Sequence, residues 1–407
     1  MAGPLTDVRI TDFTWVLAGP FCTRTLADMG AEVIKIEARN RPDPHRNYIN
    51  RTNDFPNPSP YGAFDNFNRN KLGLTINSRH SDGLALIKDL IAVSDVVTEN
   101  FRGGVLDRWG LSFDEMRKAK PDIISMSLSG FGQTGPYKNY ASHFHIPQAM
   151  SGFTRLSGID GDIPVVAGSW GDTTTGLQGA AAVCMALEHR SETGQGQKID
   201  GTQLTSTTHV MGSAFLEYTA NGTVPHANGN RLPHTATSVE GAFPCQGEER
   251  WVAVGVHTED EWRTFCATIE RTDLLDDSRF AAISDRRENW QELEIEVERW
   301  TRARTAEDAA TTLRAAGIES VVVENVVDMM EHDKQLAHRG YFVDAWHPDR
   351  SIGTLRTEGP VTKFSDTQGT IRRTAPLIGE HNEYVLGEVL GVSTNRMAEL
   401  QEAGVFF

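Results

Sequence analysis

The chain has 407 residues, of which 39% are hydrophobic, and its formal net charge at pH 7 is -16. This length is enough to bury a large core and to form two domains, because single cores stop growing at about 250–300 residues. An acidic surface repels nucleic acid and anionic membranes, so we expect neither as a partner. Any anionic ligand must then be held by local cations.

The four cysteines, Cys22, Cys184, Cys245 and Cys266, lie far apart and show no CxxC or Cys/His metal spacing. We therefore expect no metal site and no disulfide framework, as in a reduced cytoplasmic protein. The first residues, MAGPLTDVRITDF, have no basic segment followed by an apolar run, and no apolar stretch is long enough to cross a bilayer. The sequence predicts neither secretion nor membrane insertion.

Strand-like and helix-like stretches alternate over the first 132 residues. In chain order we predict a strand at 8–13, a helix at 19–30, a strand at 31–37, a helix at 78–95, a strand at 96–100, a helix at 112–122 and a strand at 123–132. Such alternation is typical of a parallel sheet covered by helices, so we predict an α/β fold with a large Rossmann-like domain. TWVLAGP, rather than GxGxxG, follows the first strand, which argues against a nicotinamide or flavin cofactor.

The second half of the chain differs in character. Residues 217–240 are rich in turn formers and are interpreted as a connection. A strand at 250–256 and charged helices at 258–269, 288–303 and 305–317 then predict a smaller α/β domain. We predict boundaries of 1–216 for the large domain, 217–345 for the connection and small domain, and 346–407 for a segment that returns to the large domain.

Ten short stretches together carry a resemblance to a known family. They are LTDVRITDFTWVLAGP, LADMGAEVIKIE, NRNKLGLTIN, VVTENFRGGVLDRWGL, GFGQTGPY, QAMSG, GDTTTG, RSETGQGQKID, DDSRF and APLIGEHN. In this order they resemble the class III coenzyme A transferases, which include formyl-CoA:oxalate and carnitine CoA-transferases and the related 2-methylacyl-CoA racemases. The resemblance implies that the large domain binds CoA, that CoA is a substrate with no permanently bound cofactor, and that the protein forms an interlocked dimer, either homomeric or with a related subunit.

Asp172 stands in AGSWGDTTTG, just before an apolar stretch. The residues alone leave two interpretations open: a simple helix N-cap, or an acid whose neighbours Gly171 and Gly176 let backbone N–H groups approach a reacting carbonyl. The resemblance implies that Asp172 is the nucleophile. Its carboxylate would attack an acyl-CoA thioester and pass through anhydride and aspartyl-CoA thioester intermediates.

The resemblance also implies which residues hold CoA. They are Val16, Ala18, Arg39, Arg46, Ile76, Asn77, Arg79, Asn100, Phe101, Arg102 and Arg108. Arginine suits this role because a guanidinium pairs bidentately with phosphate and stacks on adenine, although each arginine can equally be a solvated surface charge. Relatives often carry a basic residue directly after KIE, where this chain has Ala38 and then Arg39.

The predicted acyl site contains Trp15, Leu17, Phe144 and Gln148. Trp15 and Leu17 favour an acyl group larger or less polar than oxalate or formate, unless they belong to the core. Relatives have an acid where Phe144 stands here, and His143 and His145 flank it. We predict that one of these histidines supplies the missing acid/base group, with a structural role as the alternative.

Three functions remain open at this point. The favoured one is CoA transfer, from succinyl-CoA to an aryl-substituted or branched acid such as benzylsuccinate. A racemase would instead use His143 and Asp172 to remove and return an α-proton, but family racemases have an acid directly after that histidine, and QAMSG is typical of the transferases. The third is a CoA-binding subunit of a heteromeric CoA-transferase. The presence of Asp172, the implied nucleophile, argues against this interpretation, whereas Phe144 in place of the usual acid keeps it open.

Overall fold

The structure is a computed structural model that describes residues 3–38, 40–46, 61–159, 161–229, 237–350 and 352–406. The chain divides into two compact units. The larger comprises Met1–Arg155, Val165–Pro225 and His338–Phe407, and the smaller comprises Leu156–Pro164 and His226–Ala337.

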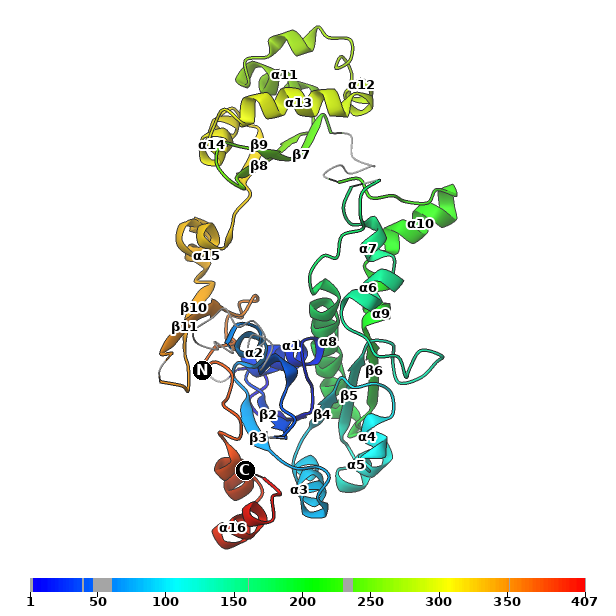
Figure 1. The fold of residues 1–407 in the computed structure, drawn as a ribbon, viewed down its shortest axis with the longest axis vertical. Coiled ribbons are helices and arrows are strands. Elements are labelled where there is room, and N and C mark those ends of the chain that lie inside the picture. The colour runs from blue at the N-terminus through cyan, green and yellow to red at the C-terminus, as the bar shows by residue number, and fades with distance from the viewer. Residues whose placement is uncertain are drawn as a thin grey trace. The chain divides into compact units, whose positions relative to one another are not determined.

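A six-stranded parallel sheet forms the centre of the larger unit (Figure 1). In spatial order its strands are β3 (Leu72–Thr75), β2 (Glu32–Glu37), β1 (Arg9–Asp12), β4 (Val96–Glu99), β5 (Ile124–Ser129) and β6 (Lys198–Thr202). The strand order reverses between β1 and β4, as in doubly wound folds, which bind their ligands outside the carboxyl ends of the strands at this point. The predicted α/β class is confirmed.

Helices cover both faces of this sheet. Those in or bordering the larger unit are α1 (Ala18–Asp28), α2 (Tyr61–Asn68), α3 (Ser81–Ala92), α4 (Val105–Arg108), α5 (Phe113–Ala119), α6 (His145–Met150), α7 (Phe153–Leu156), α8 (Trp170–Thr193), α9 (Gln203–His209), α10 (Gly212–Asn221), α15 (Lys334–Arg339) and α16 (Thr394–Glu402). Short turns of helix lie at Pro44–Arg46 and Tyr384–Val389, and the hairpin β10 (Phe342–Trp346) and β11 (Thr354–Glu358) belongs to the same unit.

Alternation along each strand creates two separate cores. Successive side chains of a strand point to opposite faces, so Val33 packs with α1 and α8 while its neighbour Ile34 packs with α3 and α5. Ile10 of β1 lies between Val33 of β2 and Val96 of β4 in register, and all three are buried. The bodies of α1 and α8 are thereby packed against β1, β2 and β4, on the two sides of the reversal point.

The smaller unit is an antiparallel sheet with helices packed on it. Its strands are β7 (Val239–Pro244), β8 (Trp251–Val256) and β9 (Glu319–Val322), and its helices are α11 (Glu259–Thr268), α12 (Ile283–Glu288), α13 (Trp290–Thr301) and α14 (Ala306–Ala315), with short helical turns at Thr272–Leu275 and Asp328–His332. The predicted strand at 250–256 and the three predicted helices are present. The interpretation of 217–240 as a connection is wrong at both ends, since α10 runs to Asn221 and β7 begins at Val239. Within the described residues, no helix is both long enough and apolar enough to span a bilayer.

Glycines on α8 allow it to pack closely against α1 and β5. A Cβ atom at Gly176 would lie 2.8 Å from the carbonyl oxygen of Ala18 and 3.1 Å from the backbone nitrogen of Cys22. A Cβ atom at Gly179 would lie 2.8 Å from Leu128. These glycines therefore permit the contact between the two helices, which lie against each other in Figure 1.

We expect Gly176→Ala to lower the free energy of unfolding by about 1–3 kcal/mol, because the added methyl group meets backbone atoms of α1. Urea denaturation would measure this change. The matched control is Gly212→Ala in α10, where a Cβ atom would meet nothing within 4 Å and alanine should raise stability by about 0.5–1 kcal/mol. Equal stability of Gly176→Ala and the unmodified protein would contradict the packing argument.

Candidate active site

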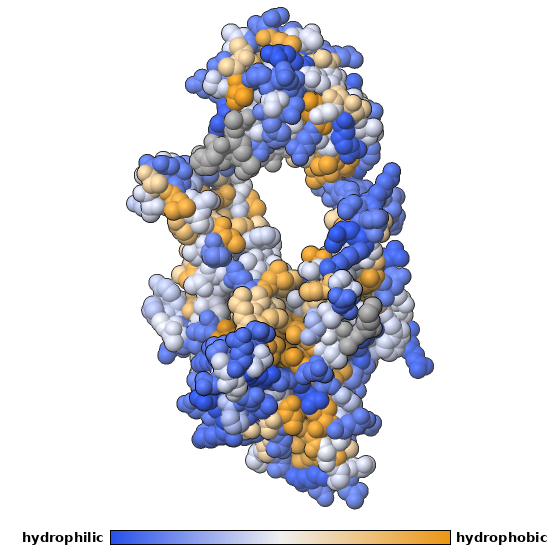
Figure 2. Space-filling model, turned by 180° about the vertical axis from the view of Figure 1, so that it is seen from behind, coloured by the Kyte–Doolittle hydropathy of each residue, from blue (hydrophilic) through white to orange (hydrophobic). Residues whose placement is uncertain are grey.

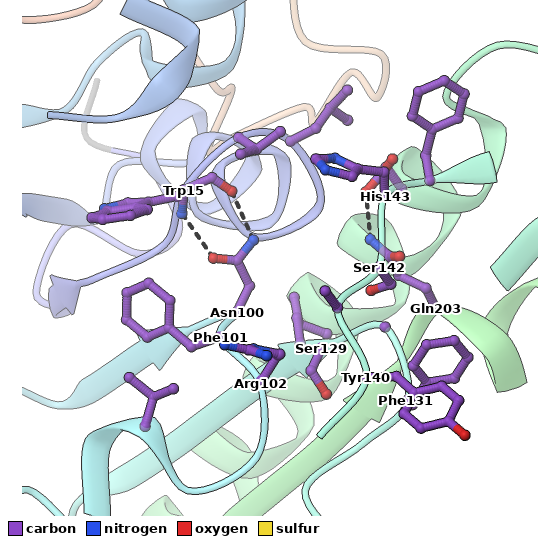
Figure 3. A pocket seen from close by; sticks show the side chains of 18 of the residues that line it. Trp15, Asn100, Phe101, Arg102, Ser129, Phe131, Tyr140, Ser142, His143 and Gln203 are labelled. Atoms are coloured by element: carbon purple, nitrogen blue, oxygen red, sulfur yellow. Dashed lines mark hydrogen bonds between the residues drawn. The ribbon is translucent and has the colours of Figure 1, made fainter. Parts of the chain in front are cut away.

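A cavity of about 760 Å³ lies in the larger unit, where the chain leaves the carboxyl ends of β1, β4 and β5. Many residues that the sequence singles out line it, namely Trp15, Val16, Leu17, Asn100, Phe101, Arg102, Arg108, His143, Phe144 and Asp172. This is the position that the reversed strand order predicts for a ligand site. Figure 3 shows how several of these side chains converge on it.

A second cavity of about 280 Å³ adjoins the first. It is lined by Ile76, Asn77 and Arg79, three further residues that the resemblance assigns to CoA. The two cavities share the side chains of Trp15, Arg41, Phe101 and Trp109. An elongated ligand can therefore contact both groups of predicted residues at once.

Several predicted residues lie away from both cavities. The guanidinium of Arg46 pairs with Glu37 at 2.6 Å and lies 3.8 Å above the ring of Phe64, so its charge is already engaged. Gln148 is buried and donates to the carbonyl oxygen of Gly168 at 3.0 Å. The exposed His145 ring is parallel to that of His143, with the centroids 6.3 Å apart. Arg39 lies outside the described residues.

Asp172 occupies the first turn of α8, and the N-cap residue of this helix is Ser169. The N-cap interpretation of Asp172 is therefore wrong. The backbone N–H of Ala18, the first residue of α1, instead lies near its carboxylate and favours the charged form. Unpaired N–H groups and the positive end of the helix dipole make this a favourable place for a negative charge.

Burial nevertheless raises the pKa of Asp172. The residue is only 6% exposed, and the loss of hydration raises its pKa to about 7, against the smaller lowering effect of the Ala18 N–H. A carboxylate with this pKa is a stronger base than an ordinary aspartate and is still substantially ionised at neutral pH.

Gln203 is the side chain that contacts this carboxylate most directly, and sequence analysis missed it. It begins α9 immediately after β6, is buried, and donates its side-chain Nε2 to Asp172 Oδ1. Its Oε1 is also buried and has no hydrogen-bond partner among the described residues. The local sequence gives no sign of this role, because the contact joins positions 31 residues apart.

The turn that follows β1 is strained and tightly held. Asn100 binds both the N–H and the C=O of Trp15 through its side-chain amide, each at 2.7 Å, as the dashed lines in Figure 3 show. Val16 has a φ of 66°, a left-handed conformation that costs a β-branched residue on the order of 1–3 kcal/mol. The Asn100 amide is thus engaged with the turn that delivers Ala18 to Asp172.

Cations gather at the first cavity although the chain is acidic. Arg41, Arg102, Arg108 and Lys138 all line it and all are exposed. The Arg41 guanidinium lies 5.2 Å from the ring of Trp15, a cation–π contact. Arg41 and Lys138 are further residues that sequence analysis missed. The described residues hold no group of three or more His, Cys, Asp or Glu side chains placed to bind a metal ion.

A family model described as CoA-transferase family III matches residues 5–382. The chain belongs to CoA-transferase family III. The resemblance on which the sequence analysis rests is confirmed, and the protein is a CoA-transferase, an enzyme that uses CoA thioesters as substrates.

Named relatives match this family III chain over almost all of its length. Succinyl-CoA–D-citramalate CoA-transferase of Chloroflexus aurantiacus is 32% identical over 98% of this chain and 97% of its own. The beta subunit of succinyl-CoA–L-malate CoA-transferase from the same organism is 31% identical over 99% and 98%. The fold is similar to that of a CAIB/BAIF family protein from Brucella suis, with a TM-score of 0.87, 27% identity, and coverage of 96% of this chain and 100% of the other.

We expect Gln203→Leu to raise the pKa of Asp172 above about 7, because the buried carboxylate loses a hydrogen-bond donor. Leucine has nearly the same volume as glutamine, so the packing around the carboxylate should change little. Carbon-13 NMR of aspartate side chains, assigned with Asp172→Asn, would follow this titration without substrate. The control is Gln195→Leu, which alters an exposed glutamine in the loop after α8. An unchanged titration in Gln203→Leu would show that its amide does not stabilise the charged form.

Proposed function

We propose that this CoA-transferase moves CoA between carboxylic acids through covalent intermediates on Asp172. The observation that carries the proposal is a buried carboxylate with a pKa of about 7 that faces a large cavity, accepts a hydrogen bond from Gln203 and lies near the N–H of Ala18. Those two donors are also suitably placed for negative charge that develops on the side-chain carbonyl of Asp172.

The proposed route divides one exchange into four substitutions at carbonyl carbon. The Asp172 carboxylate first attacks the donor thioester, the C–S bond breaks, and CoA leaves as the thiolate with a mixed anhydride behind it. The thiolate then attacks Cγ of Asp172, which releases the donor acid as its carboxylate and leaves an aspartyl-CoA thioester. The acceptor carboxylate displaces the thiolate from Cγ, and the thiolate finally attacks the acceptor carbonyl and frees Asp172. No net proton is gained or lost.

We propose that CoA extends across both cavities. The exposed cations Arg41, Arg102, Arg108 and Lys138 support phosphate binding, since guanidinium and ammonium groups are the usual partners of phosphate in an acidic protein. Arg79 in the second cavity offers a further cation for the nucleotide end. In this arrangement the thioester end reaches Asp172 in the first cavity.

The proposed donor is succinyl-CoA. The names of three relatives include this donor, with D-citramalate, L-malate or glutarate as the other acid. For the acceptor, we propose an aryl-substituted or branched acid such as benzylsuccinate. The apolar wall of the first cavity supports this choice, because Leu17, Phe131, Tyr140 and Phe144 line it and the rings of Phe131 and Tyr140 are 6.0 Å apart. His143 lines the same cavity and is the proposed polar contact for the acid.

We further propose that the protein is a dimer. Hydrophobic residues interrupt the mostly hydrophilic surface in Figure 2. In the larger unit, the exposed apolar side chains include Leu177 and Met185 on α8 and Phe215 and Leu216 on α10, with Met185 71% exposed. Apolar exposure on this scale is typical of a surface that another chain covers, whether a second copy or a related subunit.

Trapping of the intermediate would test the transfer route. We expect succinyl-CoA and hydroxylamine to yield an adduct on the peptide that contains Asp172, detected by mass spectrometry. Asp172→Asn should lower transfer by at least about 10³-fold, as removal of a covalent nucleophile does, while CoA binding changes little. Full transfer by this variant would contradict the assignment.

The presence of His143 and Asp172 in one cavity also fits a racemase, and the same incubation separates the two functions. Exchange of the α-hydrogen of a 2-methylacyl-CoA for solvent deuterium, without any adduct, would support the racemase. Activity that appears only after a related subunit is added would favour the heteromeric transferase.

The pH dependence of transfer provides an independent prediction. Only the ionised Asp172 attacks the thioester, so kcat/KM should fall about tenfold per pH unit below a midpoint near the pKa of about 7 and level off above it. Steady-state rates between pH 5.5 and 8.5 would measure this profile. A profile that is flat across this range would contradict a raised pKa for the nucleophile.

A further inference from the structure

We infer that Asp43 is a positioning residue whose carboxylate holds Val16 in its left-handed conformation, so that the N–H of Ala18 meets Asp172. Asp43 lines neither of the two cavities and is fully buried. It therefore acts on the reaction only through the turn after β1. The inference rests on the proposed function in one respect, that Asp172 is the nucleophile.

Side chains accept the N–H groups of the turn at several successive residues. Asp12 accepts that of Thr14 at 2.9 Å, Asn100 that of Trp15 at 2.7 Å, and Asp43 that of Val16 at 3.2 and 3.3 Å to its two oxygens. The N–H of Ala18 lies near Asp172 and favours its charged form, and Ala18 itself packs against α8, where a Cβ atom on Gly176 would lie 2.8 Å from the Ala18 carbonyl oxygen. Asp12 and Asp43 are fixed by ion pairs in the interior, Asn100 also binds the C=O of Trp15, and Asp172 is the carboxylate that faces the cavity.

Asp43 and Lys35 hold the turn together. The buried Lys35 Nζ lies 3.0 Å from an Asp43 carboxylate oxygen and donates to the carbonyl oxygen of Thr14 at 2.6 Å. The pair thus binds a C=O at the start of the turn and an N–H two residues later. Burial alone would raise the pKa of Asp43, but Lys35 and the N–H of His45 lower it overall, so the carboxylate stays charged.

Other charged groups near Asp43 are also fixed. Its backbone N–H is accepted by Glu37 at 2.9 Å, and Glu37 pairs with Arg46. On the other side of Lys35, Asp12 is paired with the buried Lys71 at 3.0 Å. Each charge in this cluster has a partner of opposite sign, so the position of the Asp43 carboxylate is determined by several contacts.

The left-handed conformation of Val16 is unfavourable for valine and needs the hydrogen bond from its N–H to Asp43. A Cβ atom on Gly19 would lie 2.5 Å from the Thr14 side chain, so the chain folds back closely on itself between these residues. Val16 bends the turn with a φ of 66°, which only glycine adopts freely. Without the Asp43 bond, valine would gain by relaxing to negative φ, and the N–H of Ala18 would move away from Asp172.

The test uses Asp43→Asn in the full-length protein. We expect kcat for CoA transfer to fall about 10- to 100-fold, the loss that follows small misplacements of a reacting group, with KM for succinyl-CoA changed less than about threefold. The pKa of Asp172, followed by carbon-13 NMR without substrate, should rise because the carboxylate loses the N–H of Ala18.

Rescue by glycine separates positioning from general damage. Val16→Gly, added to Asp43→Asn, should restore most of the lost kcat and return the pKa of Asp172 toward about 7, since glycine adopts positive φ without help. The matched control adds Glu270→Gly instead, which relieves a positive φ of 59° in the smaller unit and should restore nothing. If Asp43→Asn fails to fold, Asp43→Glu keeps the charge beside Lys35 and displaces the bond to Val16, with the same expected losses and rescue.

The outcomes distinguish this inference from the proposed function. Absence of transfer in the unmodified protein, or full transfer by Asp172→Asn, would overturn the function, and the NMR titration would still report on the turn. Transfer that depends on Asp172, together with unchanged kcat and unchanged titration in Asp43→Asn, would overturn the inference. So would equal activity of the two double variants.

Discussion

The site depends on buried charges beneath the turn that joins β1 to α1. Two ion pairs, Lys35 with Asp43 and Lys71 with Asp12, lie fully inside the larger unit. Moving charges out of water is costly, and attraction within a pair offsets this only when the remaining hydrogen-bonding groups are also satisfied. Asp12 meets this condition through Thr14, Thr23 and Thr98. The cluster thereby connects β1, β2, β4, α1 and the residue before β3 to a single conformation of the turn.

Much of the larger unit could be predicted from local pattern. The strands and helices between Arg9 and Ser129 that sequence analysis named occur within a few residues of their predicted ends, because their apolar periodicity is regular and glycine or proline marks several ends. β3 was missed because glycine interrupts its short LGLT stretch, which leaves no continuous apolar run. β6 was missed because KIDGT is a polar edge strand without an apolar run. Strands of that kind depend on the sheet beside them rather than on their own sequence.

Sequence predicted the site residues that come directly after strands of the sheet. It did not predict those that other segments of the chain bring to the same cavity. Trp15 to Leu17 and Asn100 to Arg102 come directly after β1 and β4, so motif and topology agree on their place. Gln203 and Arg41 reach the cavities through contacts that no local pattern encodes. Asp172 was open to interpretation as an N-cap because the start of α8 at Trp170 could not be read from a glycine-rich stretch. The domain boundaries and the roles of the site residues stay predictions.

Asp172 belongs to α8 but lies beside the first residue of α1, and this position determines how readily its carboxyl group ionises. Burial raises the pKa of this carboxyl and the N–H of Ala18 lowers it, and a pKa of about 7 means that the charged and neutral forms are nearly balanced at neutral pH. The pocket is therefore almost indifferent to whether the side chain is anionic or neutral. In the proposed route Asp172 alternates between a free carboxylate and uncharged acyl forms, and such indifference suits it because neither form is strongly favoured over the other.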